Sequence, residues 1–240
     1  MLPHDVLVAA LAFFSESLGT LSGFGSSTFF VPAASHFEKF RFVLVLTALL
    51  HCFGNVSKLA LFRESFNVRL FLLLAVPSVI FTAIGAFLAG QVGTEYLHQG
   101  LGVFLILWAL YFLIFNREPV RMPLWLAMAL TALSGFCTGL LGTGGAIRGI
   151  ALASLGTEAA VFVGLSAAID LLGDILRAVI YVQSGFMDWS QWHYLPMLFM
   201  AAWCGTLIGK MILGRINQKI FERIVAVFVL LGGVAMLVEQ

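Results

Sequence analysis

Charged side chains are scarce in this chain. Among its 240 residues there are 13 Lys and Arg and 12 Asp and Glu, so charged residues make up 10% while hydrophobic residues make up 61%. A soluble domain carries about 25% charged residues, and a single soluble core could not hide this much apolar surface behind so few charges. The mean hydropathy of +1.03 therefore indicates a polytopic membrane protein whose main surroundings are the lipid bilayer.

Cysteine and net charge are also low, and each excludes a class of function. The three cysteines, Cys52, Cys137 and Cys204, form no C-x-x-C pair, which excludes a disulfide framework and a thiolate metal site. The net charge of +1 provides no basic field, so nucleic acid is not an expected partner. We expect no metal, no cofactor and no catalytic residue.

Hydrophobic runs of the ~20 residues that cross a bilayer make up most of the chain. Turn residues or charges bound each run. We therefore expect an all-α multi-pass protein of the cell membrane, with full-length spans at about 42–62, 69–90, 96–115, 159–182, 191–211 and 219–238.

Two further regions, 5–37 and 123–156, are interrupted in the middle by small residues. The interruptions read GFGSS from Gly23 and GTGGA from Gly142. The pieces that follow have only about eleven residues, and at ~1.5 Å per residue they would reach about half-way across a ~30 Å core. At each place we expect either a re-entrant hairpin or two unusually short helices.

The sequence also repeats itself. A shift of 119 positions brings glycines, prolines and polar residues into register: Gly23 with Gly142, Gly25 with Gly144, Asn55 with Asp174, Lys58 with Arg177, Pro77 with Pro196, and Gly90 with Gly209. We interpret this as a duplication, with halves 1–118 and 119–240 forming one transmembrane domain. Each half would hold one glycine-broken helical hairpin and three long transmembrane helices.

Loop charges indicate how the halves are oriented. Lys and Arg are retained preferentially in cytoplasmic loops, and here they gather in three connections: Arg63 with Arg69, Arg117 with Arg121, and Lys210, Arg215, Lys219 and Arg223. With these loops inside, equivalent loops of the two halves lie on opposite sides, and both termini lie outside. Lys39 and Arg41 are exceptions, because this topology places them outside. Inverted repeats with discontinuous helices are typical of secondary transporters, whose sites lie at the repeat interface.

Polar residues inside the spans are candidates for the transport pathway, because a charge at a helix centre costs about 2.5–3.5 kcal/mol and usually has a partner. Helical spacing puts His51, Asn55 and Lys58 on one face of the first half, and Asp170, Asp174 and Arg177 on the equivalent face of the second. The alternative is a structural network that joins the halves. Arg148 could pair with an anion, with Glu16 or with Asp170.

The glycine breaks are candidate anion sites, because backbone N–H groups at the start of a short helix attract negative charge. We expect the anion to contact these breaks and the polar residues near them: Gly23, Gly25, Ser26, Ser27, Thr28, Gly142, Thr143, Gly144, Gly145, Arg148, Asn55 and Arg177. The alternative is close helix packing by small residues.

Coupling to protons would use groups that can change charge near neutral pH. An imidazole does so readily, and burial makes the charged form of a carboxylate less favourable. Glu16 and His51 are therefore candidate proton carriers, and Asp170 and Asp174 are candidates to line the pathway.

The glycine-rich motif near the start of each half resembles the TauE/SafE family of sulfite and organosulfonate exporters, within the toluene sulfonate uptake permease superfamily. The motif reads Gly23-Phe24-Gly25-Ser26-Ser27 followed by Pro32, and Gly142-Thr143-Gly144-Gly145. Serines replace the later glycines of the first motif, and Ala151 stands where the second proline would be. The resemblance implies transport of a small sulfur-containing anion such as sulfite, sulfoacetate or a related sulfonate.

Other functions remain as alternatives to a secondary transporter. A passive anion channel would show conductance without saturation. An intramembrane hydrolase would use Ser26 or Ser27 with His51, but no G-x-S-x-G elbow is present. A purely structural membrane subunit would leave the two polar stripes unexplained.

Overall fold

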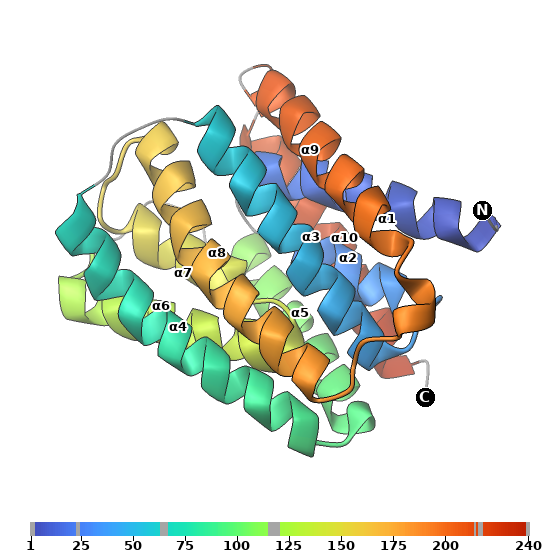
Figure 1. Cartoon of the computed structure of the whole chain (residues 1–240). Helices are drawn as coiled ribbons and strands as arrows, with labels where there is room; N and C mark the ends of the chain where they lie inside the picture. Colours follow the sequence, from blue (N-terminus) through green and yellow to red (C-terminus); the bar gives the residue numbers. More distant parts are fainter. Residues whose placement is uncertain are drawn as a thin grey trace.

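The computed structural model describes residues 3–22, 25–62, 67–114, 121–213, 215 and 218–238. These residues form α-helices and one short 3-10 helix, and the part described contains no strand (Figure 1). The helices are α1 (Pro3–Ser22), α2 (Ser27–Ala34), α3 (Phe40–Leu61), α4 (Val68–Gln91), α5 (Thr94–Ile114), α6 (Leu124–Leu141), α7 (Gly145–Ala153), α8 (Ala159–Gln183), α9 (Tyr194–Leu213) and α10 (Gln218–Val238).

Within these ranges six helices are long and apolar enough to cross a membrane: α1, α3, α4, α5, α6 and α9. The polytopic all-helical class predicted from the composition is therefore confirmed. The expected span 191–211 begins late, at Tyr194. A 3-10 turn at Trp189–Gln191 precedes it, because the Asp188 carboxylate accepts the Ser190 N–H and caps that turn instead.

Each interrupted region is a hairpin made of one long and one short helix. Helices α1 and α6 have 20 and 18 residues, whereas α2 and α7 have 8 and 9. At ~1.5 Å per residue the first pair is long enough to cross the bilayer and the second is not. The alternative of two short helices is therefore wrong, because only the piece after each break is short.

Both hairpins return to the end of the bundle at which they start. His4 Nε2 lies 3.1 Å from the carbonyl oxygen of Phe37, so the start of α1 and the residues after α2 meet. In the second hairpin Ala127, near the start of α6, shares a buried cluster with Ala151 and Leu152 of α7. Each glycine break is thus the tip of a hairpin that points into the molecule.

Contacts between connections show which of them share an end of the bundle. Arg41 donates to the carbonyl oxygen of Val92 at 3.0 Å, and its guanidinium lies 5.0 Å from the centre of the Phe186 ring. At the other end Lys210 donates to the carbonyl oxygen of Leu61 at 2.8 Å. Arg41 therefore has a structural role at the C-terminus of α4, which explains a basic residue at an end where few were expected.

Helices α3 and α8 cross at the centre of the molecule and run antiparallel (Figure 1). Asn55 contacts Asp174, and His51, one turn earlier on α3, contacts Arg177, nearly one turn later on α8. Around this pair α4 packs on α6, α1 packs on α9, and α5 packs on α10. The helices that pack together thus come from both parts of the sequence.

Glycines allow the α4–α6 packing to be close. A Cβ atom on Gly135 would overlap the Ser78 carbonyl oxygen, and one on Gly139 would overlap the Thr82 carbonyl oxygen. Small residues let helix backbones approach closely in membranes. The backbones of the two helices are therefore in direct contact along this interface.

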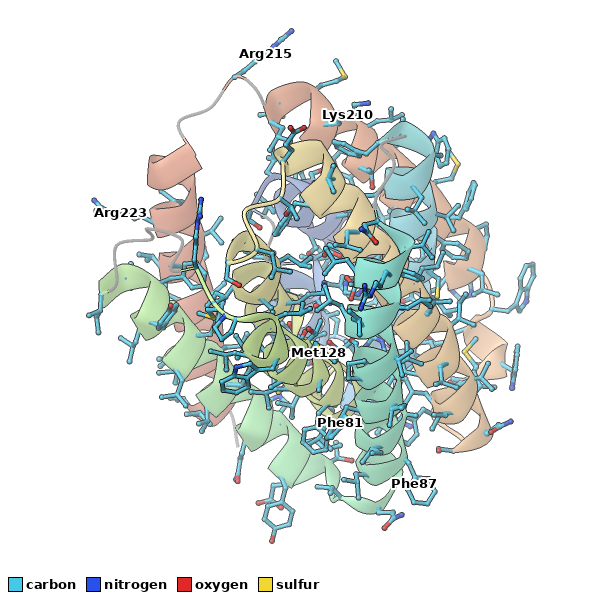
Figure 2. The ribbon with its side chains drawn as sticks, turned by 90° about the vertical axis from the view of Figure 1, so that its left-hand side faces the viewer. Phe81, Phe87, Met128, Lys210, Arg215 and Arg223 are labelled. Atoms are coloured by element: carbon cyan, nitrogen blue, oxygen red, sulfur yellow. The ribbon has the colours of Figure 1, made fainter. Side chains whose placement is uncertain are left out.

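The outer face of the same pair is apolar, as a lipid-facing surface should be. A shallow groove between α4 and α6 is lined by Pro77, Phe81 and Met128 together with other apolar residues. Figure 2 shows Phe81 and Met128 on this face and Phe87 further along it, whereas Lys210 and Arg215 lie at the opposite end of the molecule. The basic residues that the figure labels thus lie away from the apolar face.

Candidate functional site

The two glycine breaks meet inside the molecule. Ser27 Oγ donates to Thr143 Oγ1 at 3.1 Å, and Thr28 Oγ1 lies 3.2 Å from the same atom. All three residues are buried. Neither Ser26 nor Gly144, the N-cap residues of α2 and α7, donates or accepts a side-chain capping hydrogen bond, although the first N–H groups of any helix lack partners within the helix. In α2 the Ser27 N–H is accepted by His51 Nε2 instead. Hydroxyl groups and helix N-termini therefore converge at one place.

Glycine is required at these breaks by the backbone conformation and by the space. Gly25 and Gly142 have φ angles of +86° and +80°, a region that side chains with a Cβ atom avoid. Gly142 ends α6 in the left-handed conformation typical of helix C-termini. A Cβ atom on Gly144 would overlap the carbonyl oxygen of Ser134, whose hydroxyl donates to the Gly144 carbonyl at 2.7 Å.

Glu16 is completely buried and pairs with Lys58. The Lys58 Nζ atom lies 2.6 Å from Glu16 Oε1, and Ser26 Oγ donates to Glu16 Oε2 at 2.6 Å. Thr206 donates to the same carboxylate at 3.4 Å. This pair fixes the N-cap of α2 to α1 and α3, so the Lys58 ammonium belongs to the interior of the protein.

Arg148 pairs with Asp170, which is one of the three partners that the sequence left open for it. The guanidinium contacts both carboxylate oxygens, and its Nε atom donates to Ser166 Oγ at 2.9 Å. Arg148 is 5% exposed and Asp170 is 15% exposed at the side chain. The pair joins α7 to α8.

Asp174 is the acceptor at which three polar side chains meet. Arg177 Nε donates to Asp174 Oδ1 at 2.8 Å, and Asn55 Nδ2 donates to Oδ2 at 2.8 Å. His51 Nδ1 lies 3.7 Å from the same Oδ2 atom. The two polar stripes therefore face each other across the α3–α8 crossing.

Arg177 also holds the end of α6 next to the second break. Its Nη1 atom donates to the carbonyl oxygens of Thr138 and Gly142 at 3.3 and 3.4 Å. Tyr181, one turn further along α8, donates to the Gly139 carbonyl at 2.5 Å. Because a cation near a helix C-terminus satisfies its last carbonyls, Arg177 and Tyr181 fix the position of the break.

The charges of this polar cluster balance among the residues described. Three fixed cations, Lys58, Arg148 and Arg177, each contact one carboxylate, that of Glu16, Asp170 and Asp174 respectively. His51 lies beside the third pair. An anion that enters this region would therefore find its fixed positive charges already neutralised.

The structure brings most of the predicted site residues together. The set around the breaks and the α3–α8 crossing comprises Gly25, Ser26, Ser27, Thr28, Gly142, Thr143, Gly144, Gly145, Arg148, Asn55, Arg177, Glu16, His51, Asp170 and Asp174. Gly23 lies outside the described residues, as do the expected loop residues Arg63 and Arg117. The described residues contain no group of three His, Cys, Asp or Glu side chains arranged to bind a metal ion.

Sequence reasoning missed residues that support the site from outside the motifs. Ser134, Thr138 and Tyr181 hold the second break, and Thr206 reaches Glu16. Tyr181 carried a usable signal, because it lies four residues after Arg177 and so on the same helical face. Thr206 carried none, since it comes from α9, far away in sequence.

The serine hydroxyls are not directed at the histidine as a hydrolase would require. Ser26 Oγ donates to Glu16 and Ser27 Oγ donates to Thr143. His51 Nε2 accepts the backbone N–H of Ser27 at 3.1 Å. This arrangement favours a binding role for both hydroxyl groups.

Comparison with known families agrees with the anion-binding role that the geometry favours. A family model described as sulfite exporter TauE/SafE matches residues 8–236. The chain belongs to this family. No curated protein and no solved structure matches it. The match extends from α1 to α10, and TauE/SafE membership implies a membrane transporter of sulfite-like anions.

Proposed function

We propose that this TauE/SafE protein is a secondary transporter of a small sulfur oxyanion or organosulfonate, such as sulfite or sulfoacetate, in the plasma membrane. The observation that carries the proposal is the meeting of two helix starts, neither capped by its own N-cap side chain, with the hydroxyls of Ser27, Thr28 and Thr143. N–H and O–H groups donate hydrogen bonds to anions, and the helix N-termini add partial positive charge.

The anion would bind between the two breaks, in contact with backbone N–H groups of residues 25–28 and 143–145, since the Gly142 N–H already donates to the Thr138 carbonyl. Arg148, Asn55 and Arg177 were expected to contact it as well. Because their polar atoms already hold Asp170 and Asp174, we assign them the role of holding the breaks in place. The bound anion would then be selected mainly by hydroxyl and backbone donors.

Alternating access would follow from an inverted repeat of the halves 1–118 and 119–240. Two features support such a repeat: the equivalent helices α3 and α8 run antiparallel, and the packing of α4 on α6 corresponds to that of α9 on α1. The hairpins would open toward opposite sides of the membrane. The α1–α2 hairpin would open at the Arg41 end, which lies outside, and the α6–α7 hairpin at the Lys210 end, which lies inside. Exchanging the conformations of the two hairpins would expose the site alternately to each side.

Uptake into proteoliposomes tests this function. Purified protein should accumulate 35S-labelled sulfite, sulfoacetate or methanesulfonate above empty liposomes, with saturation and with stimulation by unlabelled anion on the other side. A channel would show neither saturation nor stimulation of this kind. If none of these anions moves through well-folded protein, the proposed function is wrong.

Variants of the hydroxyl groups locate the site. Ser27→Ala and Thr143→Val should each raise the KM by about tenfold to a hundredfold, since a hydrogen bond to a charged group contributes ~1.5–3 kcal/mol. Ser57→Ala and Thr47→Val are matched controls, because these buried hydroxyls donate to the carbonyls of their own helix, Phe53 and Val43. An unchanged KM in Ser27→Ala and Thr143→Val would show that the glycine breaks are not part of the binding site.

A further inference from the structure

The imidazole of His51 faces an N–H donor at each of its two nitrogen atoms. Ser27 N donates to Nε2 at 3.1 Å, and Arg177 Nη2 lies 3.2 Å from Nδ1. A guanidinium has donors and no acceptor, and a neutral imidazole carries one N–H group and one acceptor nitrogen. In any neutral form, therefore, one of the two contacts sets a donor against a donor.

A neutral ring with its hydrogen on Nδ1 has a favourable arrangement available. Its Nε2 atom accepts the Ser27 N–H, and the Asp174 carboxylate attracts the hydrogen on Nδ1 although Oδ2, 3.7 Å from Nδ1, lies beyond hydrogen-bond distance. A second hydrogen on Nε2 removes this acceptor and places two N–H groups opposite each other. Protonation of His51 therefore breaks its hydrogen bond with the start of α2.

The surroundings of His51 carry balanced charge. The charged groups that face this region are Glu16 from α1, Lys58 from α3 itself, Arg148 from α7, and Asp170, Asp174 and Arg177 from α8. Helix α2 presents the uncharged Ser27 and Thr28, and α9 reaches the cluster through the uncharged Thr206. The fixed charges pair among themselves, so a proton on His51 adds one uncompensated positive charge.

We propose that His51 binds one proton for each anion transported, and that an oxygen of the anion takes the place of Nε2 as acceptor of the Ser27 N–H. The protonated Nε2–H and the Ser27 N–H then both donate to the anion. The proton comes from the solution on the side at which the site is open, and it leaves with the anion on the other side. This assignment rests on the proposed transport function and specifies its coupling.

The stoichiometry has an electrical consequence. A singly charged anion that moves with one proton carries no net charge, so its transport is electroneutral. A doubly charged anion would carry one net negative charge. Burying an ion in an apolar region costs several kcal/mol, which is why the empty site would bind the proton and the anion together more readily than either alone.

The test uses methanesulfonate, whose sulfonate group stays ionised between pH 5 and 8, so any proton that moves with it must be carried by the protein. Proteoliposomes that contain a trapped pH dye should show one proton entering per 35S-labelled anion. Setting the membrane potential with potassium and valinomycin should leave the initial rate unchanged. If sulfoacetate is the better substrate, the same proton count should accompany one net negative charge.

The variant His51→Gln should lose the acid stimulation of uptake and the accompanying proton movement. Its amide oxygen can reach the Ser27 N–H but cannot take up a proton in this pH range. His98→Gln is the matched control, since His98 lies on α5 against the ring of Phe40 of α3, away from the cluster. This variant should retain the acid stimulation of uptake and the proton movement.

A second measurement does not depend on flux. When methanesulfonate or sulfoacetate is added to detergent-purified protein in weak buffer near pH 7, the protein should take up one proton per bound anion. The variant His51→Gln should take up none. Proton uptake that persists in His51→Gln, or anion transport without any proton, overturns this proposal and leaves the transport function standing. Absence of anion binding and transport in folded protein overturns the transport function itself.

Discussion

Asn55 donates a 2.8 Å hydrogen bond to Asp174, from the C-terminal half of α3 to the C-terminal half of α8. These two residues occupy equivalent positions of the sequence repeat, 119 residues apart. The contact between equivalent positions, in helices that run antiparallel, is what an axis of pseudo-symmetry through the crossing point would produce. Asp174 also accepts a hydrogen bond from Arg177 and lies near His51, so this one carboxylate joins three polar side chains of the proposed site.

The first prediction concerns this carboxylate. Asp174→Asn removes the counter-charge of the fully buried Arg177, and breaking a buried pair in this way costs about 3–5 kcal/mol. We expect a large fall in the thermal unfolding midpoint of the purified protein, measured by fluorescence-detected size exclusion. Asp188→Asn changes an exposed carboxylate in a loop and should leave the midpoint nearly unchanged. Equal effects in both variants would show that the charge pair contributes little.

The second prediction separates charge from pairing at Glu16 and Lys58. Glu16→Gln leaves a buried ammonium without its partner and should lower the unfolding midpoint, as should Lys58→Met, which leaves the carboxylate without its cation. The double variant should recover much of the loss, because both charges are then absent. Additive losses in the double variant would mean that the two residues do not stabilise each other.

The third prediction concerns the geometry of the Arg177 guanidinium. In Arg177→Lys the ammonium can still pair with Asp174, but it cannot also reach the carbonyls of Thr138 and Gly142. We expect folded protein whose anion transport falls about tenfold, which corresponds to a loss of ~1.4 kcal/mol. Arg215→Lys, at an exposed position, should transport normally. Normal transport in Arg177→Lys would show that residue 177 needs only a positive charge and not the shape of the guanidinium.

The fourth prediction tests the close packing of α4 on α6. Gly139→Ala places a methyl group against the backbone of Thr82 and Ala86, and overpacking of this kind costs about 1–3 kcal/mol. The variant should unfold at a lower temperature and show reduced expression. Gly100→Ala, whose added methyl group would lie 3.4 Å from a flexible Leu141 side chain, should be neutral or slightly stabilising. A stable Gly139→Ala would show that the helices can separate at small cost.

Much of the architecture could be predicted from the sequence, because bilayer thickness fixes the length of apolar runs and glycines break them. The helices α3, α4, α5, α8 and α10 lie within a few residues of the predicted spans. The sequence left a re-entrant hairpin and two short helices as alternatives at each break. It could not choose between them, since the return of α2 and α7 depends on contacts such as that of Ser134 with Gly144. The start of α9 was missed because a local cap at Asp188 competed with the helix.

The sequence by itself determined the membrane class, the two breaks and the short list of buried polar residues, because each follows from composition or from spacing along one helix, and it predicted a repeat. The tertiary structure decided the partners. Arg148 could have paired with Glu16, but the packing of α7 on α8 gives it Asp170, and Lys58 of α3 neutralises Glu16 instead. Such choices depend on distances between helices that are far apart in the chain, and a buried charge selects whichever opposite charge the fold brings within reach.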